Sequence, residues 1–295
     1  MEIRGTTKLL GVFGDPIAHT LSPLIHRILI QERGDDLCYV PLRVRPEDLS
    51  TALKGVYAMD FQGINLTIPH KQAVIPYCRR LDESALYAGA VNTLKRTDEG
   101  FIGYNTDIYG FETLVGLVGV PAKGAKVLIL GAGGAAHSAI CASRNLGAAE
   151  IVIANRTYER GLKLVQEFQA AWEGDGPDLR TVSMDSLSRE AFPIVFQTTS
   201  AGMKPHTETL PVPRDQADFY RRIEYAVDMV FNPGETAFLK EAASYGAKVR
   251  GGLSMLFFQG VKAYEIWTDK AFSEDEKQRM HEVFLDLAGK ELYDR

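Results

Sequence analysis

The sequence lacks any apolar run long enough to span a membrane, and it has no strong excess of charge of either sign. Because a membrane helix needs about 20 apolar residues, we expect no membrane partner. The formal net charge is −5 with the signs interspersed, which argues against a nucleic-acid surface, since such surfaces concentrate Lys and Arg. The first residues contain no apolar core of the kind found in secretion signals. We therefore expect a cytoplasmic protein.

Cysteine is scarce as well. Cys38, Cys78 and Cys141 lie far apart in apolar segments and form no CxxC pair, so we expect buried thiols rather than disulfides or metal ligands. The histidines show no HExxH spacing, and no serine lies in a GxSxG turn. These absences argue against a zinc protease and against the common serine hydrolases. The sequence predicts no metal site.

A glycine-rich turn follows a strand-like apolar run at residues 126–130. Gly131 suits the tight turn, Gly133 lets backbone N–H groups approach a pyrophosphate, and Ala136 permits close packing of the following helix. That helix, expected from about 134 to 146, offers its N-terminus to phosphates. The turn therefore predicts a dinucleotide site formed by Gly131, Ala132, Gly133, Gly134 and Ala135.

The next strand, expected at 150–154, ends at Asn155, Arg156 and Thr157 instead of at an acid. An acid at this place would bind the free 2′-hydroxyl of NAD. A guanidinium group matches a phosphate through two hydrogen bonds, so Arg156, with Arg160 one turn further on, favours the 2′-phosphate of NADP. We predict NADP(H) as the cofactor.

The chain has 295 residues, of which 45% are hydrophobic, and this length suits two domains. Strand and helix patterns alternate before the glycine turn, which predicts a mostly parallel α/β layer. Segments 91–96 and 101–105 resemble a hairpin added to that layer. The two helices expected at 255–268 and 273–287 add nothing that the second sheet requires. We expect them to return to the first domain.

The fold class predicted is therefore α/β, with a mostly parallel N-terminal domain and a Rossmann-type, doubly wound domain that binds NADP. The chain would leave the first domain at residue 107 and re-enter it at 255. The expected domains are 1–107 with 255–295, and 108–254.

Two polar residues stand directly before apolar helical patterns. Ser22 precedes Pro23 and a stripe of apolar side chains, so Ser22 is predicted as an N-cap with Pro23 as the first helical residue. Asp107 is a natural N-cap of the helix expected at 108–117. Taken alone, a lysine such as Lys71 is ordinarily a solvated surface charge.

Four strings occur in a fixed order around the glycine turn, at residues 65–71, 90–93, 104–110 and 251–259. With these strings the chain resembles the shikimate dehydrogenase family over essentially its whole length. The resemblance implies NADP-dependent interconversion of 3-dehydroshikimate and shikimate. It also implies that the first domain is the substrate-binding, catalytic one, with an active site between the domains that closes on its ligands.

Within that resemblance, Lys71 is the residue implied to transfer the proton, or to orient and stabilise the reacting oxygen, with Asp107 as its partner. The hydroxyls of Thr20 and Ser22 are implied to bind the substrate carboxylate. The residues implied to bind the ring hydroxyls are Asn65, Thr67, Asn92 and Gln259. The amide of Gln259 lies on an apolar helical stripe and must find a buried partner or line a cavity, whereas asparagines in loops often satisfy backbone groups instead.

Further cofactor contacts implied by the resemblance are Thr199, Met203, Met229, Gly252 and Met255. The chain also departs from the family pattern at three places. Thr20 replaces a serine, Gln197 replaces an asparagine, and Phe231 replaces a tyrosine that commonly lies near the substrate carboxylate. These changes leave room for a quinate/shikimate dehydrogenase of relaxed substrate or cofactor choice. A non-catalytic binding protein that keeps the pocket is a third hypothesis, which Lys71 and Asp107 disfavour. We expect a monomer or a homodimer.

Overall fold

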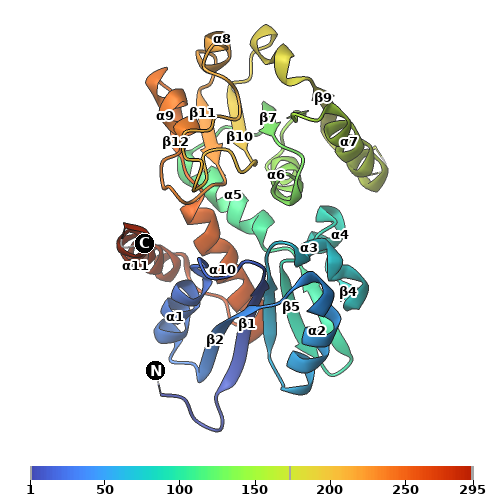
Figure 1. Cartoon of the computed structure of the whole chain (residues 1–295), viewed down its shortest axis with the longest axis vertical. Coiled ribbons are helices and arrows are strands. Elements are labelled where there is room, and N and C mark those ends of the chain that lie inside the picture. The colour runs from blue at the N-terminus through green and yellow to red at the C-terminus, as the bar shows by residue number, and fades with distance from the viewer. Residues whose placement is uncertain (1, 173, 294–295) are drawn as a thin grey trace. The chain divides into compact units, whose positions relative to one another are not determined.

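The computed structural model describes residues 2–172 and 174–293, and the chain divides into two compact units (Figure 1). Unit 1 comprises Met1–Asp107 and Phe257–Arg295, and unit 2 comprises Ile108–Leu256. The chain passes between the units within two helices, α5 (Asp107–Val118) and α10 (Leu253–Thr268). Each unit has its own sheet.

The sheet of unit 1 has the strand order β2-β1-β3-β5-β6-β4. Its strands are β1 (Lys8–Gly14), β2 (Leu37–Arg43), β3 (Gly63–Leu66), β4 (Cys78–Leu81), β5 (Thr93–Thr97) and β6 (Gly100–Tyr104). β1 pairs in parallel with β2 and β3, whereas β5 runs antiparallel to both β3 and β6. The predicted parallel layer with an added hairpin is confirmed.

Helices cover both faces of this sheet. From the N-terminal part come α1 (Ser22–Arg33), α2 (Leu49–Ala58), α3 (His70–Ala73) and α4 (Glu83–Ala88), with short 3₁₀ turns η1 (Pro46–Asp48) and η2 (Ile75–Tyr77). α2 presents Leu53 and Val56 to a core that includes Ile64 and Phe101. This burial of an apolar helix stripe against the sheet is what stabilises the layer.

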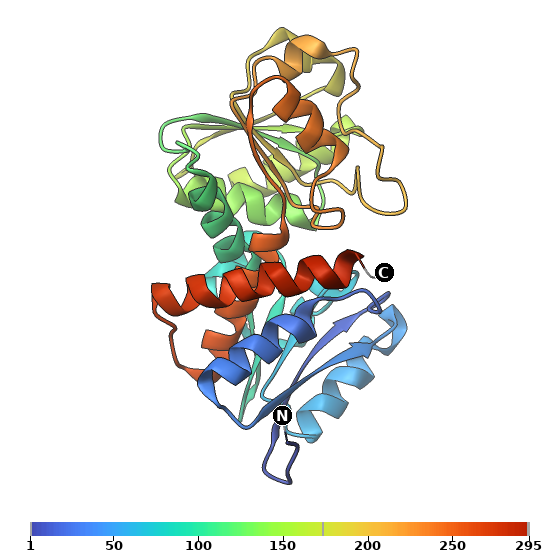
Figure 2. The same ribbon diagram turned by 90° about the vertical axis from the view of Figure 1, so that its left-hand side faces the viewer.

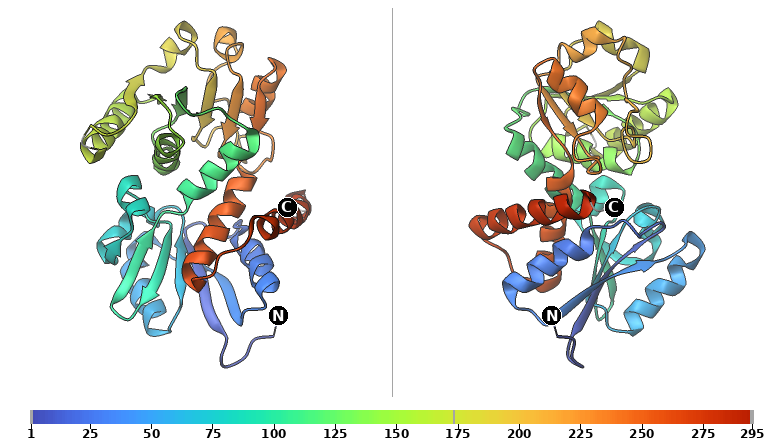
Figure 3. Two further views of the ribbon diagram at one scale, coloured as in Figure 1. Left: turned by 180° about the vertical axis from the view of Figure 1, so that it is seen from behind. Right: turned by 60° about the vertical axis from the view of Figure 1, so that its left-hand side comes forward.

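Most of α10 and the helix that follows it belong to unit 1. α11 (Glu274–Tyr293) lies alongside α1 (Figure 2), and α10 lies against the sheet (Figure 3). The indole Nε1 of Trp267 in α10 donates to Leu94 O at 2.8 Å. A Cβ on Gly63 would collide with the same indole ring. Glycine at this strand position therefore lets α10 pack directly on β3.

α1 begins one residue earlier than predicted. Leu21 is its N-cap, Ser22 is the first helical residue, and no side chain caps this end. The prediction of Ser22 as the N-cap is wrong, because Thr20 Oγ1 takes over a related role by accepting from Ser22 N at 3.2 Å. The Ser22 hydroxyl is thereby left for partners outside the helix.

Unit 2 has an all-parallel sheet in the order β12-β11-β10-β7-β8-β9. Its strands are β7 (Lys126–Leu130), β8 (Glu150–Ala154), β9 (Asp178–Val182), β10 (Ile194–Gln197), β11 (Tyr225–Asp228) and β12 (Lys248–Arg250). Most positions of β7, β8 and β10 are buried apolar residues, as expected for parallel strands covered on both faces.

The helices of unit 2 complete the Rossmann-type arrangement. Besides α5 they are α6 (Gly134–Asn145), α7 (Tyr158–Trp172), α8 (Ala217–Tyr220) and α9 (Ala237–Ser244), with the 3₁₀ segment η3 (Met184–Arg189). The chain moves outward from β7 in one direction to β8 and β9, and in the other direction to β10, β11 and β12. Ligands of doubly wound sheets bind at the carboxyl ends of the strands where this direction changes. The predicted fold class is confirmed.

Among the described residues, no helix has both the length and the apolar character needed to cross a bilayer.

Candidate active site

Polar side chains gather at the carboxyl end of the parallel strands of unit 1. Lys71 lies on α3, shortly after β3, and Asp107 is the first residue of α5. Lys71 Nζ lies 2.6 Å from Asp107 Oδ2, and the two side chains are 29% and 11% exposed. Partial burial strengthens such a pair relative to one in water. The structure thus brings together the two residues predicted to be catalytic.

Asn92 holds the other oxygen of this carboxylate. Its Nδ2 donates to Asp107 Oδ1 at 2.8 Å and to Thr106 Oγ1 at 2.9 Å. Its Oδ1 accepts from Thr106 N at 2.8 Å and from the Thr93 hydroxyl at 3.0 Å. With both ends of the amide in use, the side chain has one orientation, and Asp107 is fixed toward Lys71.

Asp107 does not cap its own helix, so that prediction is wrong. Its backbone N–H donates to Asn105 Oδ1 at 3.1 Å, and Asn105 Nδ2 donates to Ala90 O at 3.0 Å. Asn105 supplies the oxygen at the start of α5, which frees the Asp107 carboxylate for Lys71 and Asn92. Sequence reasoning gave no role to Asn105, although it lies within one of the matched strings.

The two hydroxyls predicted to bind the carboxylate are adjacent. Thr20 lies in the segment between β1 and α1, and its Oγ1 is 3.1 Å from Oγ of Ser22, the first residue of α1. Ser22 is buried, whereas Thr20 is partly exposed. Because Ser22 does not cap α1, its hydroxyl is not occupied by the backbone at the helix start.

The remaining predicted substrate residues of unit 1 come from two elements. Asn65 in β3 is buried and donates through Nδ2 to Asn92 O at 3.2 Å and to Thr93 Oγ1 at 3.0 Å. Thr67 follows β3, and a Cβ on Gly14 would collide with its methyl group. Gln259 on α10 is buried, with 7% of its surface exposed. A buried amide on this helix face agrees with the predicted stripe.

In unit 2 the glycine-rich turn follows β7 as predicted. Gly131 has φ +113°, and a Cβ there would lie 2.7 Å from Thr198 Oγ1. Only glycine fits this turn without strain. A Cβ on Gly133 or on Gly134 would meet no protein atom within 4 Å. Protein packing therefore does not require those two glycines, and both are exposed at the start of α6.

The residues after β8 form a largely exposed turn and the start of α7, and they include two arginines. Asn155 Nδ2 donates to Thr157 O at 2.8 Å and shapes the turn. Arg156 and Arg160 are exposed, and within the described part of the chain neither guanidinium pairs with a carboxylate. Ala132 and Ala135 are small, partly exposed residues of the glycine turn. The donor set thus fits the 2′-phosphate of NADP.

Gln197, at the end of β10, organises the loop that follows it. Its Oε1 accepts from Thr199 N at 2.5 Å, and its Nε2 donates to Ala201 O at 3.1 Å and to Asp228 Oδ1 at 3.3 Å. Asp228 in turn accepts from Val230 N at 2.8 Å and from the Thr236 hydroxyl at 2.6 Å. Glutamine at position 197 therefore ties the loops after β10 and β11 together. Sequence reasoning missed Asp228.

Burial raises the pKa of Asp228 to about 6, although hydrogen bonds from Thr236, Val230 and Gln197 oppose the shift. The unfolded chain ionises this carboxyl near pH 3.8, so between that pH and about 6 the native state holds the extra proton. The stability that this proton provides is complete below the unfolded pKa and is lost as pH rises through the native pKa. The loss amounts to about 3 kcal/mol.

We therefore expect Asp228→Asn, which mimics the protonated side chain, to become more stable relative to wild type as pH rises from about 4 to 7, by about 3 kcal/mol. Urea unfolding at a series of pH values measures the difference. Asp218→Asn is the matched control, because the Asp218 side chain is 64% exposed. A difference between wild type and Asp228→Asn that stays constant with pH would contradict the shift.

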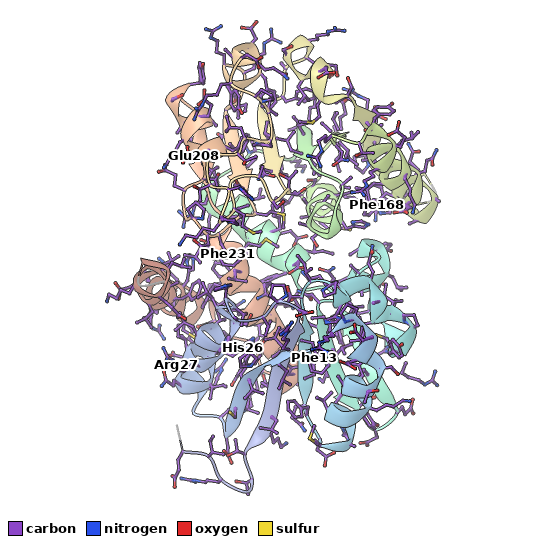
Figure 4. All side chains as sticks on the ribbon, in the orientation of Figure 1. Phe13, His26, Arg27, Phe168, Glu208 and Phe231 are labelled. Atoms are coloured by element: carbon purple, nitrogen blue, oxygen red, sulfur yellow. The ribbon has the colours of Figure 1, made fainter. Side chains whose placement is uncertain are left out.

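The other predicted cofactor residues also belong to unit 2. Thr199 and Met229 are partly exposed, Met203 is 47% exposed, and Met255 is buried. A Cβ on Gly252 would collide with Met229 O, so packing alone already requires that glycine. Phe231, labelled in Figure 4, is a half-buried residue of unit 2. Unlike Lys71, Phe231 belongs to unit 2.

Within the described residues, no group of three or more His, Cys, Asp and Glu side chains is arranged to hold a metal ion. The three cysteines are free thiols.

Two family models match the chain. The model described as shikimate dehydrogenase substrate binding domain matches residues 12–94, and the model described as shikimate / quinate 5-dehydrogenase matches residues 117–202. The shikimate dehydrogenase (NADP(+)) of Geobacter metallireducens is 40% identical over 274 residues, which cover 91% of this chain and 93% of the relative. The enzyme of the same name from Moorella thermoacetica is 38% identical over 271 residues, which cover 92% and 91%.

Solved structures give the same result. A crystal structure of shikimate 5-dehydrogenase from Thermus thermophilus, in complex with NADP(H) and shikimate, superimposes with a TM-score of 0.81 at 31% identity. The alignment covers 94% of this chain and 99% of that one. The likeness thus extends over both units.

Proposed function

The chain belongs to the shikimate dehydrogenase family, and we propose that it catalyses the reversible, NADP-dependent reduction of 3-dehydroshikimate to shikimate, a step in the biosynthesis of aromatic amino acids. The observation that carries the proposal is the Lys71–Asp107 pair at 2.6 Å, held in one geometry by Asn92. A ketone reduction needs one group that supplies a proton or positive charge to the carbonyl oxygen. This pair presents such a group.

When bound, NADP(H) supplies or accepts the hydride. Lys71 Nζ exchanges a proton with the oxygen on the reacting carbon. It donates the proton during reduction and receives it during oxidation. The Asp107 carboxylate lies 2.6 Å from Nζ and holds the lysine side chain in place. Asn92 keeps the carboxylate from rotating away by donating to its Oδ1. Asn105 holds the backbone of the same residue by accepting from Asp107 N.

We propose that the substrate is recognised by hydrogen bonds to its carboxylate and to its ring hydroxyls. Thr20 and Ser22 donate their hydroxyls to the carboxylate. The ring hydroxyls are bound by Asn65, Thr67, Asn92 and Gln259, together with Lys71 and Asp107. Groups already fixed by the network, such as Asn65 and Asn92, lose little conformational entropy on binding.

Unit 1 is proposed as the substrate-binding, catalytic domain and unit 2 as the NADP-binding domain. In unit 2 we assign the pyrophosphate to the turn from Gly131 to Ala135. The 2′-phosphate is assigned to Asn155, Arg156, Thr157 and Arg160. The nicotinamide side is formed by Thr199, Met203, Met229, Gly252 and Met255. Hydride transfer requires the nicotinamide to reach the substrate carbon.

We further propose that the protein acts in the cytoplasm, as a monomer or a homodimer. Three free thiols, two of them buried, suit a reducing compartment.

A dual quinate/shikimate dehydrogenase is the second candidate, and Phe231 favours it, since the hydroxyl that the family commonly places near the substrate carboxylate is missing. We expect Phe231→Tyr to lower KM for shikimate about tenfold, because a hydrogen bond to a charged group is worth roughly 1.5–3 kcal/mol. Initial-rate kinetics with saturating NADP⁺ measure the change. Tyr245→Phe, at an exposed tyrosine of the same unit, should leave KM unaltered. An unchanged KM in Phe231→Tyr would contradict the assigned role.

Absorbance at 340 nm, with the purified chain, NADP⁺ or NAD⁺, and shikimate or quinate, tests the proposal. Reduction of NADP⁺ with shikimate supports it, and comparable turnover of quinate supports the dual enzyme. If every pair is silent while shikimate still binds in calorimetry, the non-catalytic binding protein is correct.

A further inference from the structure

Tyr39 on β2 lies beneath the proposed substrate site but belongs to none of the strings matched to the family. Its hydroxyl donates to Asn65 Oδ1 at 2.7 Å, and its side chain is buried, with 8% of the residue exposed. We propose that Tyr39 is a positioning residue that holds Asn65 in place, and so determines how tightly shikimate binds.

The hydrogen-bond partner of the phenol belongs to the proposed recognition site, where Asn65 is assigned to the ring hydroxyls. A shift of the Tyr39 oxygen would therefore move a predicted ring contact.

Tyr39 also decides which way the Asn65 amide faces. Asn65 Nδ2 donates to Asn92 O at 3.2 Å and to Thr93 Oγ1 at 3.0 Å, while Oδ1 accepts from Tyr39. Without the phenol, the buried Oδ1 loses this donor, and leaving such an acceptor unpaired is costly. The amide would then rotate in search of another donor. The predicted ring contact depends on the orientation that Tyr39 enforces.

The ring of Tyr39 is held by aromatic neighbours. His26 on α1, labelled in Figure 4, stacks on it with ring centroids 4.0 Å apart and an interplanar angle of 18°. Trp267 on α10 also packs near this ring, with the ring centroids of Trp267 and Tyr39 6.2 Å apart. Complete burial lowers the pKa of His26 to about 3, so its ring is neutral and acts as an apolar plate. A phenylalanine at position 39 would keep this stacking and lose only the hydroxyl.

This inference rests on the proposed function and is tested by kinetics with shikimate as the varied substrate. We expect Tyr39→Phe to raise KM for shikimate about tenfold while kcat stays within about twofold, because an interaction made equally in ground and transition states affects binding alone. KM for NADP⁺ should be unchanged. A role that is merely structural would lower the amount of folded enzyme without shifting KM.

Tyr264→Phe is the matched control. Tyr264 lies near the same histidine, with ring centroids 6.5 Å apart, but its hydroxyl donates to Asp35 Oδ2 at 2.5 Å. It should alter stability and leave KM for shikimate as in wild type. A double-mutant cycle with Asn65→Ala adds a second readout: Tyr39→Phe should change KM much less in the Asn65→Ala background than in wild type.

Each outcome has a definite meaning. An unchanged KM in Tyr39→Phe, an equal rise in Tyr264→Phe, or full additivity with Asn65→Ala would overturn the role of Tyr39 while leaving the proposed function intact. A wild type that neither binds nor oxidises shikimate would overturn the proposed function, and with it the role of Tyr39 in shikimate binding.

Discussion

Lys71→Ala should reduce kcat for shikimate oxidation about a thousandfold, within the range that a positioned acid/base group contributes. Removing the lysine side chain leaves the reacting oxygen without a group that donates or accepts its proton. It also leaves the partly buried Asp107 carboxylate without its ion-pair partner. KM for NADP⁺ should change little, since Lys71 belongs to unit 1. Initial rates at 340 nm measure the effect.

Lys95→Ala is the matched control for this experiment. Lys95 also belongs to unit 1, its Nζ lies 2.6 Å from Asp269 Oδ1, and its side chain is 21% exposed. The two lysines thus share an ion-pair distance and a similar exposure, so a general effect of losing a lysine pair would appear in both. Wild-type kcat in Lys95→Ala with near-normal kcat in Lys71→Ala would contradict the catalytic role.

Arg156→Ala should lower kcat/KM for NADP⁺ about thirtyfold, because it removes a charge-assisted hydrogen-bonding group from the 2′-phosphate, worth roughly 2 kcal/mol. NAD⁺ carries no such phosphate, so kcat/KM for NAD⁺ should change less than about threefold. The measurement is the ratio of kcat/KM for NADP⁺ to kcat/KM for NAD⁺. This ratio should fall further when Arg160→Ala is added.

Lys163→Ala serves as the control for cofactor choice. Lys163 lies on α7, three residues after Arg160, and its side chain is 78% exposed, with Nζ 3.6 Å from Glu167 Oε1. Its removal takes away one positive charge from the same helix and should leave the NADP⁺/NAD⁺ ratio as in wild type. Equal losses for both cofactors in Arg156→Ala would show that the arginine acts on the fold and not on the phosphate.

The parts of the fold that sequence predicted are those whose signals are local. β7 and the turn at Gly131 combine a buried apolar run with a glycine at positive φ, and the β5–β6 hairpin carries its own turn. Two strands were missed, β4 and β9, which lie at sheet edges. No position of β4 is buried, and its exposure shows no period-2 alternation, so only its pairing with β6 makes it a strand.

The site divides in a similar way. Lys71 and Asp107 were found through the family resemblance, and their contact is a fact of tertiary structure that no spacing displays. Tyr39 and Asp228 were missed because their partners are distant in sequence: Tyr39 bonds to Asn65, and Asp228 to Gln197. The N-cap predictions failed at Ser22 and Asp107 for a related reason. A neighbouring side chain, from Thr20 or Asn105, satisfies the backbone instead.

The transfer of hydrogen from shikimate to the cofactor is the central claim, and isotope labelling tests it most directly. Shikimate carrying deuterium on the carbon to be oxidised would be incubated with this protein and NADP⁺, and the cofactor analysed by mass spectrometry. The account predicts reduced cofactor one mass unit heavier than NADPH, together with unlabelled 3-dehydroshikimate. Cofactor that remains oxidised, or that is reduced without deuterium, would contradict it.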